Sequence, residues 1–304
     1  MRKWTYRQAW ACLIGSTVAT LALSLAGYSL WQRWQLHRLA DPQYRITSIV
    51  QTGPEREALR TAVLAELLHL SADEPVSLYR FNADLAAKTL MACPLISHAL
   101  VKKVFPGTLY IDYSLRKPVA WLADYQNCGL DKDGYFFPVA PFYSPKNLPE
   151  IYLGLSPFDL SDPQHGRGGG VWKIDSHDKY LTIALDILQM LHEAPWREGM
   201  RLKRIDVSNA FASSAGQREI VLLTEDEFVF RENDFMAVCI FPKILRLPSK
   251  DYAQQLSNFL TLRRTMLDDY RRQIQKKHCT SSPTRFAPRI VDLRIPQMAF
   301  VQNN

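Results

Sequence analysis

One short stretch of the sequence combines side chains that bind metals. Asp175, His177 and Asp178 fall within four residues, and carboxylate and imidazole groups are ligands that zinc accepts. The seven histidines of the chain nevertheless show no H-x-x-x-H or similar ligand spacing. A solvated polar loop explains this stretch better, so we expect no metal ligands.

Other groups with catalytic chemistry lack the context that catalysis needs. Residues 165–170 (His-Gly-Arg-Gly-Gly-Gly) have the composition of an anion-binding loop, but no Lys-Ser/Thr pair follows them. Ser208 has no G-x-S-x-G setting. Asp268 and Asp269 fall on a charged helix whose polar face we expect in water. We therefore predict no catalytic residue, no cofactor and a protein that is not an enzyme.

The net charge of +7 over 304 residues is unevenly distributed. Residues 1–40 contain five Lys and Arg and no Asp or Glu, whereas the remainder contains 32 basic and 30 acidic residues. A nucleic-acid-binding body would carry its excess charge on the folded part. The sequence therefore predicts no nucleic-acid partner.

The N-terminal segment has the length and composition of a membrane span. Residues 8–32 contain no charged side chain, and about 20 helical residues cross the hydrocarbon core of a bilayer. Aromatic residues occur at both ends of the segment, as at membrane interfaces. We predict a tail at 1–9, a span at 10–31 through membrane lipid and a linker at 32–43. The alternative is a cleaved signal peptide, whose apolar region is usually only 7–15 residues long.

The charges around this span indicate its orientation. Arg2, Lys3 and Arg7 precede it, while Arg33 and Arg38 follow it. This bias favours a cytoplasmic N-terminus and an exported body. We therefore expect a single-pass protein of the cell inner membrane with a periplasmic body.

Residues 44–117 predict five elements in the order β-α-α-β-β. A short strand is expected at 44–50, and Pro54 suits the first turn of a helix that continues to about residue 70. A strand is expected at 96–104 and another at 108–116, the latter with Leu109, Ile111 and Tyr113 on one face.

The second helix of this segment is predicted over residues 82–92. Asn82 is its expected N-cap, Leu85 and Leu90 are expected to face inward, and Pro94 ends it.

Three stretches carry a family resemblance, and their order after one apolar span makes it specific. The first is Gly53 followed by an amphipathic helix. The second comprises Pro94, Ile96, Ala99, Val101, Val104, Pro106, Thr108, Leu109 and Ile111. The third comprises Arg116, Lys117, Pro118, Val119, Ala120 and Trp121. Together they resemble the FtsQ/DivIB family of bacterial cell-division proteins, although Leu115 stands where that family usually has Glu.

The resemblance implies an α+β protein: an N-terminal transmembrane helix, a β-α-α-β-β POTRA domain at 44–117, and a mixed β-domain with flanking helices at 118–304. Residues 130–137, with the turn signal Asp133-Gly134, are similar to a hairpin of the family. Residues 290–294 are similar to its closing strand, and residues 298–301 would form the last strand. Residues 141–178 are rich in Pro, Gly, Asp and Ser and predict loops.

Between these landmarks the patterns predict a helix at 180–191, strands at 202–207, 219–223 and 227–230, and a long charged helix at 252–277.

By the same resemblance, the terminal strand would receive an FtsB/FtsL-like pair by strand addition. The candidate contacts are Arg294, Ile295, Gln297, Ala299, Phe300 and Val301. Ile295 replaces a family aromatic, and Pro296 removes one backbone donor. The alternative is that Leu293 and Phe300 are core residues of a terminal strand.

The expected role is a scaffold at the division septum that links the FtsB/FtsL-like pair to the septal peptidoglycan synthase complex. Two other functions stay open at this point. A POTRA-bearing transport or outer-membrane assembly component usually carries several such domains or a barrel. A membrane-anchored extracytoplasmic enzyme would have a deep polar pocket.

Overall fold

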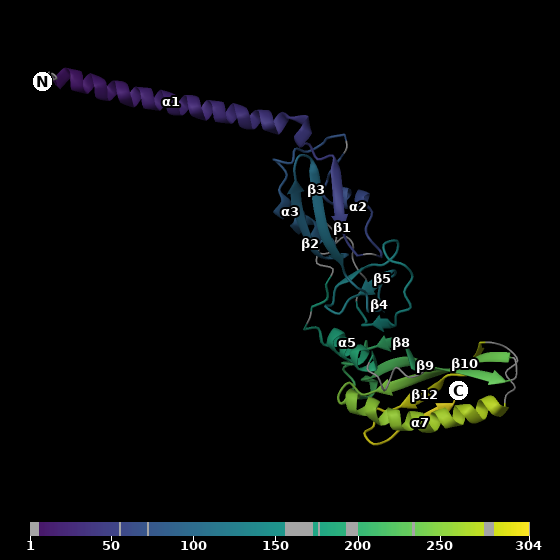
Figure 1. Cartoon of the computed structure of the whole chain (residues 1–304). Coiled ribbons are helices and arrows are strands. Elements are labelled where there is room, and N and C mark those ends of the chain that lie inside the picture. Colours follow the sequence, from purple (N-terminus) through teal and green to yellow (C-terminus); the bar gives the residue numbers. More distant parts are fainter. Residues whose placement is uncertain are drawn as a thin grey trace. The chain divides into compact units, whose positions relative to one another are not determined.

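The protein is a mixed α+β molecule in a computed structural model that describes residues 6–54, 56–71, 73–155, 173–175, 177–192, 200–232, 235–276 and 283–303. The chain divides into two compact units, Met1–Leu115 and Arg116–Asn304 (Figure 1).

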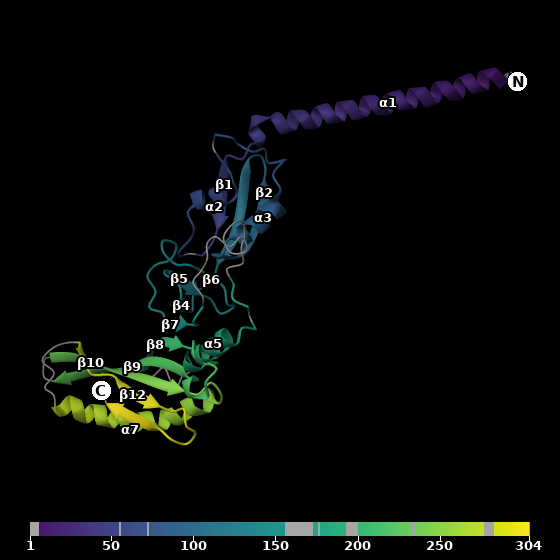
Figure 2. The same cartoon turned by 180° about the vertical axis from the view of Figure 1, so that it is seen from behind.

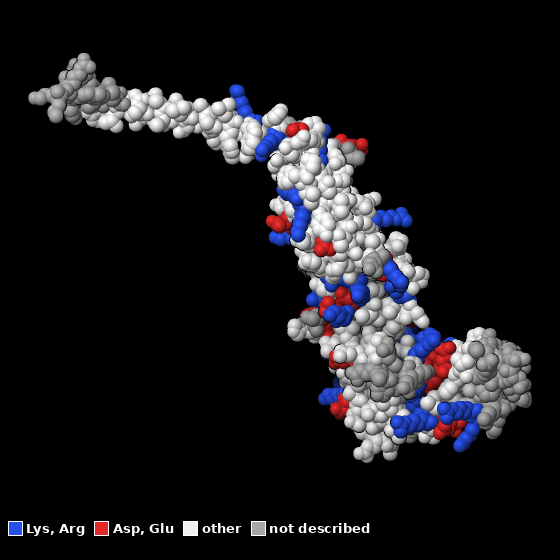
Figure 3. Space-filling model, in the orientation of Figure 1, with Lys and Arg blue, Asp and Glu red and all other residues white. Residues whose placement is uncertain are grey.

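The N-terminal unit begins with helix α1 (Tyr6–Ala40). Its segment Leu13–Leu39 has a mean hydropathy of 1.5 and none of it is buried, so this helix is long and apolar enough to cross a membrane. Figure 3 shows Lys and Arg side chains near its C-terminal end. Several of its hydroxyl groups donate to carbonyl groups of the same helix, as Thr20 Oγ1 does to the Ser16 carbonyl at 2.8 Å, and a membrane-spanning helix would need its polar groups paired in this way. The helix also continues through most of residues 32–43, where we expected a linker.

A three-stranded sheet follows in the order β1-β3-β2. Strand β1 (Ser48–Thr52) runs parallel to β3 (Thr108–Leu115), and β2 (Ile96–Val104) runs antiparallel to it. Leu109, Ile111 and Tyr113 of β3 are all buried, as predicted. Helices α2 (Thr61–Leu67) and α3 (Ala83–Ala92) lie between β1 and β2 in the chain.

Helix α2 starts seven residues later than Pro54, so the predicted helix start was wrong. Glu57 has a φ of 67°, which interrupts any helix there. The backbone N–H of the buried Leu59 instead donates to the Tyr113 hydroxyl at 2.7 Å. Gly53 permits this approach, because a Cβ there would lie 2.7 Å from the Tyr113 ring. The segment before α2 is thus tied to the sheet.

Helix α3 has the predicted range, and the Asn82 side chain caps it by accepting from the N–H groups of Asp84 and Leu85. Leu90 is buried, but Leu85 is 61% exposed, so its predicted inward orientation was wrong. Ala86 and Leu90, four residues apart, share the buried face. Leu85 lies five residues from Leu90 and therefore on another face.

The C-terminal unit is built on a ten-stranded sheet in the order β13-β12-β10-β9-β8-β7-β4-β5-β6, with β11 also paired to β10. Its first strands are short: β4 (Ala120–Leu122), β5 (Cys128–Leu130), β6 (Phe136–Pro138) and β7 (Glu150–Tyr152). The turn between β5 and β6 is the predicted one, and Gly134 there has a φ of 81°.

The centre of this sheet is a long hairpin. Strand β8 (Met200–Asp206) pairs with β9 (Ile220–Glu232), which pairs with β10 (Phe235–Leu247) over the whole length of both strands. The sequence predicted two short strands within the range of β9 and did not predict β10.

Two helices contribute to the core of this unit. Helix α5 (Lys179–His192) buries Leu181, Ile187 and Leu191, and α7 (Tyr252–Lys276) buries Leu256 and Phe259. Figures 1 and 2 both show α7 lying along the β9–β10 hairpin. The chain ends with β11 (Thr284–Arg285), β12 (Arg289–Asp292) and β13 (Phe300–Asn303).

Candidate functional site

Strand β13 forms one end of the ten-stranded sheet. Strand β12 pairs in parallel with β10, and β13 pairs with β12 in antiparallel register, with Val301 opposite Val291 and Phe300 opposite Asp292. No strand of the described part of the chain pairs with the other side of β13. That side therefore presents backbone N–H and C=O groups to which another chain can pair.

The six predicted contact residues divide between this strand and the connection before it. Phe300 and Val301 lie on β13, and Ala299 immediately precedes it. Arg294, Ile295 and Gln297 lie in the connection from β12. They are not strand residues, because β12 already ends at Asp292.

A tight turn reverses the chain between the two strands. The Met298 N–H donates to the Ile295 carbonyl at 3.2 Å, and Gln297 has a φ of 63°. Pro296 sits inside this turn and outside both strands. The backbone donor that Pro296 lacks is therefore not one of the donors of β13.

The two side chains at the start of β13 point to opposite faces of the sheet. Val301 lies opposite the buried Val291, which lies opposite the buried Leu245 in β10. These three share the face of Lys243, which contacts Asp226 and, through it, Arg263 of α7. Phe300, one residue earlier, therefore faces away from α7. Phe300 is 56% exposed and Val301 is 44% exposed, so a partner strand would find an apolar side chain on each face.

A groove adjoins the edge on each face. On the α7 face, a groove of about 510 Å³ lies between α7 and the connection, and its lining includes Leu262, Leu293 and Met298. On the other face, a groove of about 500 Å³ is lined by Ile295 and Phe300 together with Arg218 and Lys250. The sequence predicted the long helix at 252–277 but not its position beside the edge, because that position depends on packing between distant segments.

Arg294 is partly buried and is bonded to other groups of its own unit. Its Nε and Nη2 donate to the two carboxylate oxygens of Asp292 at 3.0 and 2.7 Å, and its Nη1 donates to the Gly216 carbonyl at 3.2 Å. Nη1 also lies 3.3 Å from a carboxylate oxygen of Glu219. Arg294 therefore fixes the start of the connection, and it also lines the groove beside Phe300. Its contact with a partner stays a prediction.

This pairing changes the acidity of Asp292. Partial burial raises the pKa of its carboxyl group, but hydrogen bonds from Arg294 and the positive charges of Arg294 and Arg246 outweigh burial and hold the pKa below its usual value. Asp292 is therefore ionised near neutral pH, as its hydrogen bonds from the Arg294 guanidinium require.

The other sequence candidates are placed as follows. His177 Nδ1 lies 3.3 Å from Asp175 Oδ1 with both side chains exposed, and Asp178 accepts from the N–H groups that begin α5. Within the described residues, no group of three His, Cys, Asp or Glu side chains could hold a metal ion. Residues 165–170 fall outside the described part. Ser208 donates to Asp206, and Asp268 and Asp269 lie on the exposed side of α7.

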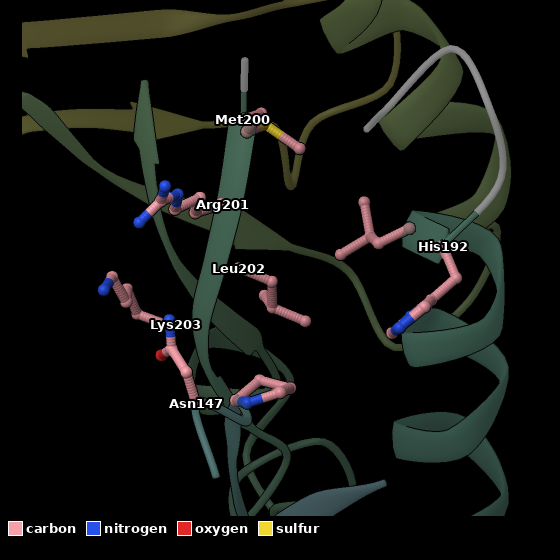
Figure 4. Close-up of a pocket in the computed structure, with 8 residues that line it drawn as sticks. Asn147, His192, Met200, Arg201, Leu202 and Lys203 are labelled. Carbon is pink, nitrogen blue, oxygen red and sulfur yellow. The ribbon is translucent and has the colours of Figure 1, made fainter. Parts of the chain in front are cut away.

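A small cavity of about 280 Å³ lies between α5 and β8 (Figure 4). Leu202 and His192 point into it, whereas Arg201 and Lys203 point to the other side of the strand. Those two cations lie 3.0 Å from Glu227 and 3.4 Å from Glu225. The lining of this cavity therefore brings no set of ionisable groups together.

Cys93 and Cys128 are free thiols. Burial raises the pKa of the Cys128 thiol to about 11, which keeps it protonated and unreactive near neutral pH.

Comparison with known proteins gives no family assignment. No protein-family model matches the chain, and no curated protein matches its sequence.

Proposed function

We propose that this protein is a single-pass scaffold of bacterial cell division that works without catalysis. It would bind an FtsB/FtsL-like pair at strand β13 and so regulate septal peptidoglycan synthesis. The observation that carries the proposal is the terminal strand itself, because β13 ends its sheet and presents an exposed apolar side chain on each face. Together with one apolar N-terminal helix, this suits a membrane-tethered adaptor.

The N-terminal unit supports the comparison with a POTRA domain. Its elements follow the order β-α-α-β-β, and the last strand lies between the other two in the sheet. The FtsQ/DivIB resemblance implies an apolar helix, then this unit, then a larger sheet unit, and the elements of the chain follow that order.

The edge geometry supports strand addition as the binding mode. Backbone pairing gives affinity without sequence preference, and side-chain pockets on the two faces give specificity. The groove on the α7 face suits apolar side chains of the partner, because Leu262, Leu293 and Met298 line it. The groove on the other face adds the cations Arg218 and Lys250, which favour a partner with acidic residues there.

Anchoring to one membrane makes a small contact area sufficient. Four residues of β13 bury little surface, but tethering of both partners raises their effective concentration. We therefore expect weak binding between isolated bodies and stable association in the membrane.

Two proline substitutions test this mode. Along a strand, successive N–H groups point to opposite sides, so of Val301 and Gln302 one donates toward β12 and the other toward the open side. Only one of the variants Val301→Pro and Gln302→Pro removes a donor that pairs β13 with β12 and so loosens that pairing. Hydrogen exchange of β12 and β13 shows which variant this is. The proline variant that leaves the amides of β12 protected from exchange should co-purify at least tenfold less of the FtsB/FtsL-like pair than the wild type does.

The matched controls are Val301→Ala and Gln302→Ala, which keep both donors. Equal co-purification of the β12-preserving proline variant and its alanine control would contradict strand addition. At the cellular level, the proposal fails if no division protein associates with the wild type and its depletion leaves septation intact.

A further inference from the structure

The N-terminal unit carries an exposed aromatic cluster that its fold does not explain. The rings of Tyr44, Tyr79 and Phe105 contact one another, with centroids 5.0 Å apart for Tyr44 and Tyr79, 5.2 Å for Tyr79 and Phe105, and 6.3 Å for Tyr44 and Phe105. Phe105 is 53% exposed. Exposed clusters of large apolar side chains mark interaction sites more often than isolated ones do.

The three rings come from segments that hydrogen bonds hold together. The Leu78 N–H donates to the Tyr44 carbonyl at 2.7 Å, and the Thr47 N–H donates to the Gly107 carbonyl at 2.9 Å. At Gly107 a Cβ would lie 2.4 Å from the Arg45 carbonyl, so glycine permits this close approach. The cluster is therefore a fixed part of the surface at the point where the chain enters the unit.

The covalent chain keeps this cluster near the membrane if α1 spans it. The uncharged part of α1 ends at Gln32, and the helix continues to Ala40, which adds about 12 Å at 1.5 Å per residue. From Ala40 to Tyr44 a fully extended chain adds at most about 14 Å, so Tyr44 lies within about 26 Å of the end of the uncharged segment. Residues Pro42–Tyr44 form a 3₁₀ turn, which shortens the path further.

The chemistry of the cluster fits a lipid interface. Tyrosine rings favour the headgroup level of a bilayer because they combine an apolar body with a hydroxyl group. The neighbouring Arg45 and Arg80 are exposed and positively charged, which suits anionic lipid headgroups. Asp41, the acidic residue closest to Tyr44 in sequence, accepts a hydrogen bond from the Gln43 N–H at 3.0 Å.

We propose that Tyr44, Tyr79 and Phe105 form a membrane-contact surface that seats the N-terminal unit on the lipid headgroups. This inference rests on α1 being a membrane span, as in the proposed function. Seating would hold the unit at a defined height above the bilayer. Because the tether is short, a weak lipid contact would keep the surface occupied.

Site-specific photocrosslinking of the full chain tests this surface. We would place p-benzoylphenylalanine at Phe105 or Tyr79 and reconstitute the protein in nanodiscs of three parts phosphatidylethanolamine to one part phosphatidylglycerol. Mass spectrometry should then show lipid adducts at both positions.

The matched control position is Met91, which is 41% exposed in the same unit. It lies near the end of α3 that leads into β2, whereas Phe105 follows the other end of that nine-residue strand, about 27 Å away along it. We expect at least tenfold less lipid adduct at Met91. Absence of lipid adducts at Phe105, or equal yields at Phe105 and Met91, would overturn the inference.

Substitution of Leu25 in α1 by the same photoreactive residue separates the two proposals. Lipid adducts at Leu25 without adducts at Phe105 would leave the span intact and refute the contact surface. Absence of adducts at Leu25 would instead refute the span and, with it, the tethered scaffold.

Discussion

Asp226 is the shared anion of a buried charge network in the C-terminal unit. It lies on β9 and is almost fully buried with Lys243 of β10 and Arg263 of α7. Lys243 donates to one of its carboxylate oxygens, and Arg263 donates to the other at 3.2 and 3.1 Å. The network thus joins α7 to the hairpin that supports β12 and β13.

Removal of the Asp226 carboxylate, which both cations share, should lower the free energy of unfolding more than removal of one cation. Asp226→Asn removes the carboxylate charge that Lys243 and Arg263 share in the buried network, so we expect it to lower the free energy of unfolding by about 3–5 kcal/mol. Lys243→Met leaves Asp226 paired with Arg263 and should lower the free energy of unfolding by a smaller amount. Apart from the tryptophans of the first 40 residues, Trp121, Trp172 and Trp196 are the only ones in the chain, so tryptophan fluorescence in urea follows this unit.

The matched control is Asp268→Asn, which removes an exposed carboxylate of α7 that lies 3.3 Å from Arg271. Such pairs contribute about 0–1 kcal/mol. If Asp226→Asn lowers the free energy of unfolding no more than Asp268→Asn does, the buried network does not stabilise the unit.

Lys243 also makes stability depend on pH. Burial lowers the pKa of its ammonium group from 10.5 to about 8; Asp226 partly offsets this, and the positive charges of Arg263 and Arg289 add to it. Between pH 8 and 10.5 the unfolded chain still holds a proton that the folded chain has released. The free energy of unfolding should therefore rise with pH in this range, by up to about 1.4 kcal/mol per pH unit.

Comparison with Lys243→Met isolates this titration from those of other groups. The stability difference between wild type and variant should be constant below pH 7 and should shift in favour of the wild type from pH 8 to pH 10. Urea unfolding at pH 6, 7, 8, 9 and 10 measures it. Parallel curves for the two proteins would show that Lys243 does not titrate in this range.

At the scale of elements, local signals decided which parts of the fold the sequence could predict. Asn82 marks the start of α3, Pro94 marks its end, and Pro106 marks the turn between β2 and β3. The predicted ranges of these three elements were correct to within a residue. The start of α2 was wrong, because a contact with Tyr113, more than 50 residues away, overrides the favourable position of Pro54.

Strand β10 shows the limit of pattern analysis more clearly. Its central part is apolar and contains Pro242, which argues against a central strand when the sequence is taken alone. The structure nevertheless pairs it with β9 along thirteen residues. Such a pairing follows from long-range burial under α7, which no local window contains.

The candidate site was predictable to the same extent. A terminal strand containing Phe300 and Val301 was implied by the resemblance of residues 290–294 to the closing strand of the FtsQ/DivIB family. The roles of Arg294 and Pro296 could not, because they depend on where β12 ends and on the carbonyl of Gly216, 78 residues away.

At the scale of the whole molecule, the distribution of charge makes a prediction about topology. Arg2, Lys3 and Arg7 precede the apolar helix, and Arg33 and Arg38 follow it. Basic residues near a span remain on the cytoplasmic side. We therefore expect the wild-type body to be exported and to be digested by protease added to spheroplasts.

Replacement of Arg2, Lys3 and Arg7 by serine should reverse the charge bias and retain a large fraction of the bodies inside, where they resist protease. The matched control replaces Arg33 and Arg38 by serine, which strengthens the original bias and should leave digestion complete. The mass of the mature chain distinguishes a retained anchor from a cleaved signal peptide. Two results would exclude a tethered extracytoplasmic scaffold: protease resistance of the wild-type body in intact spheroplasts, or a mature chain that lacks the N-terminal helix. Binding through β13 at the septum requires both export and the anchor.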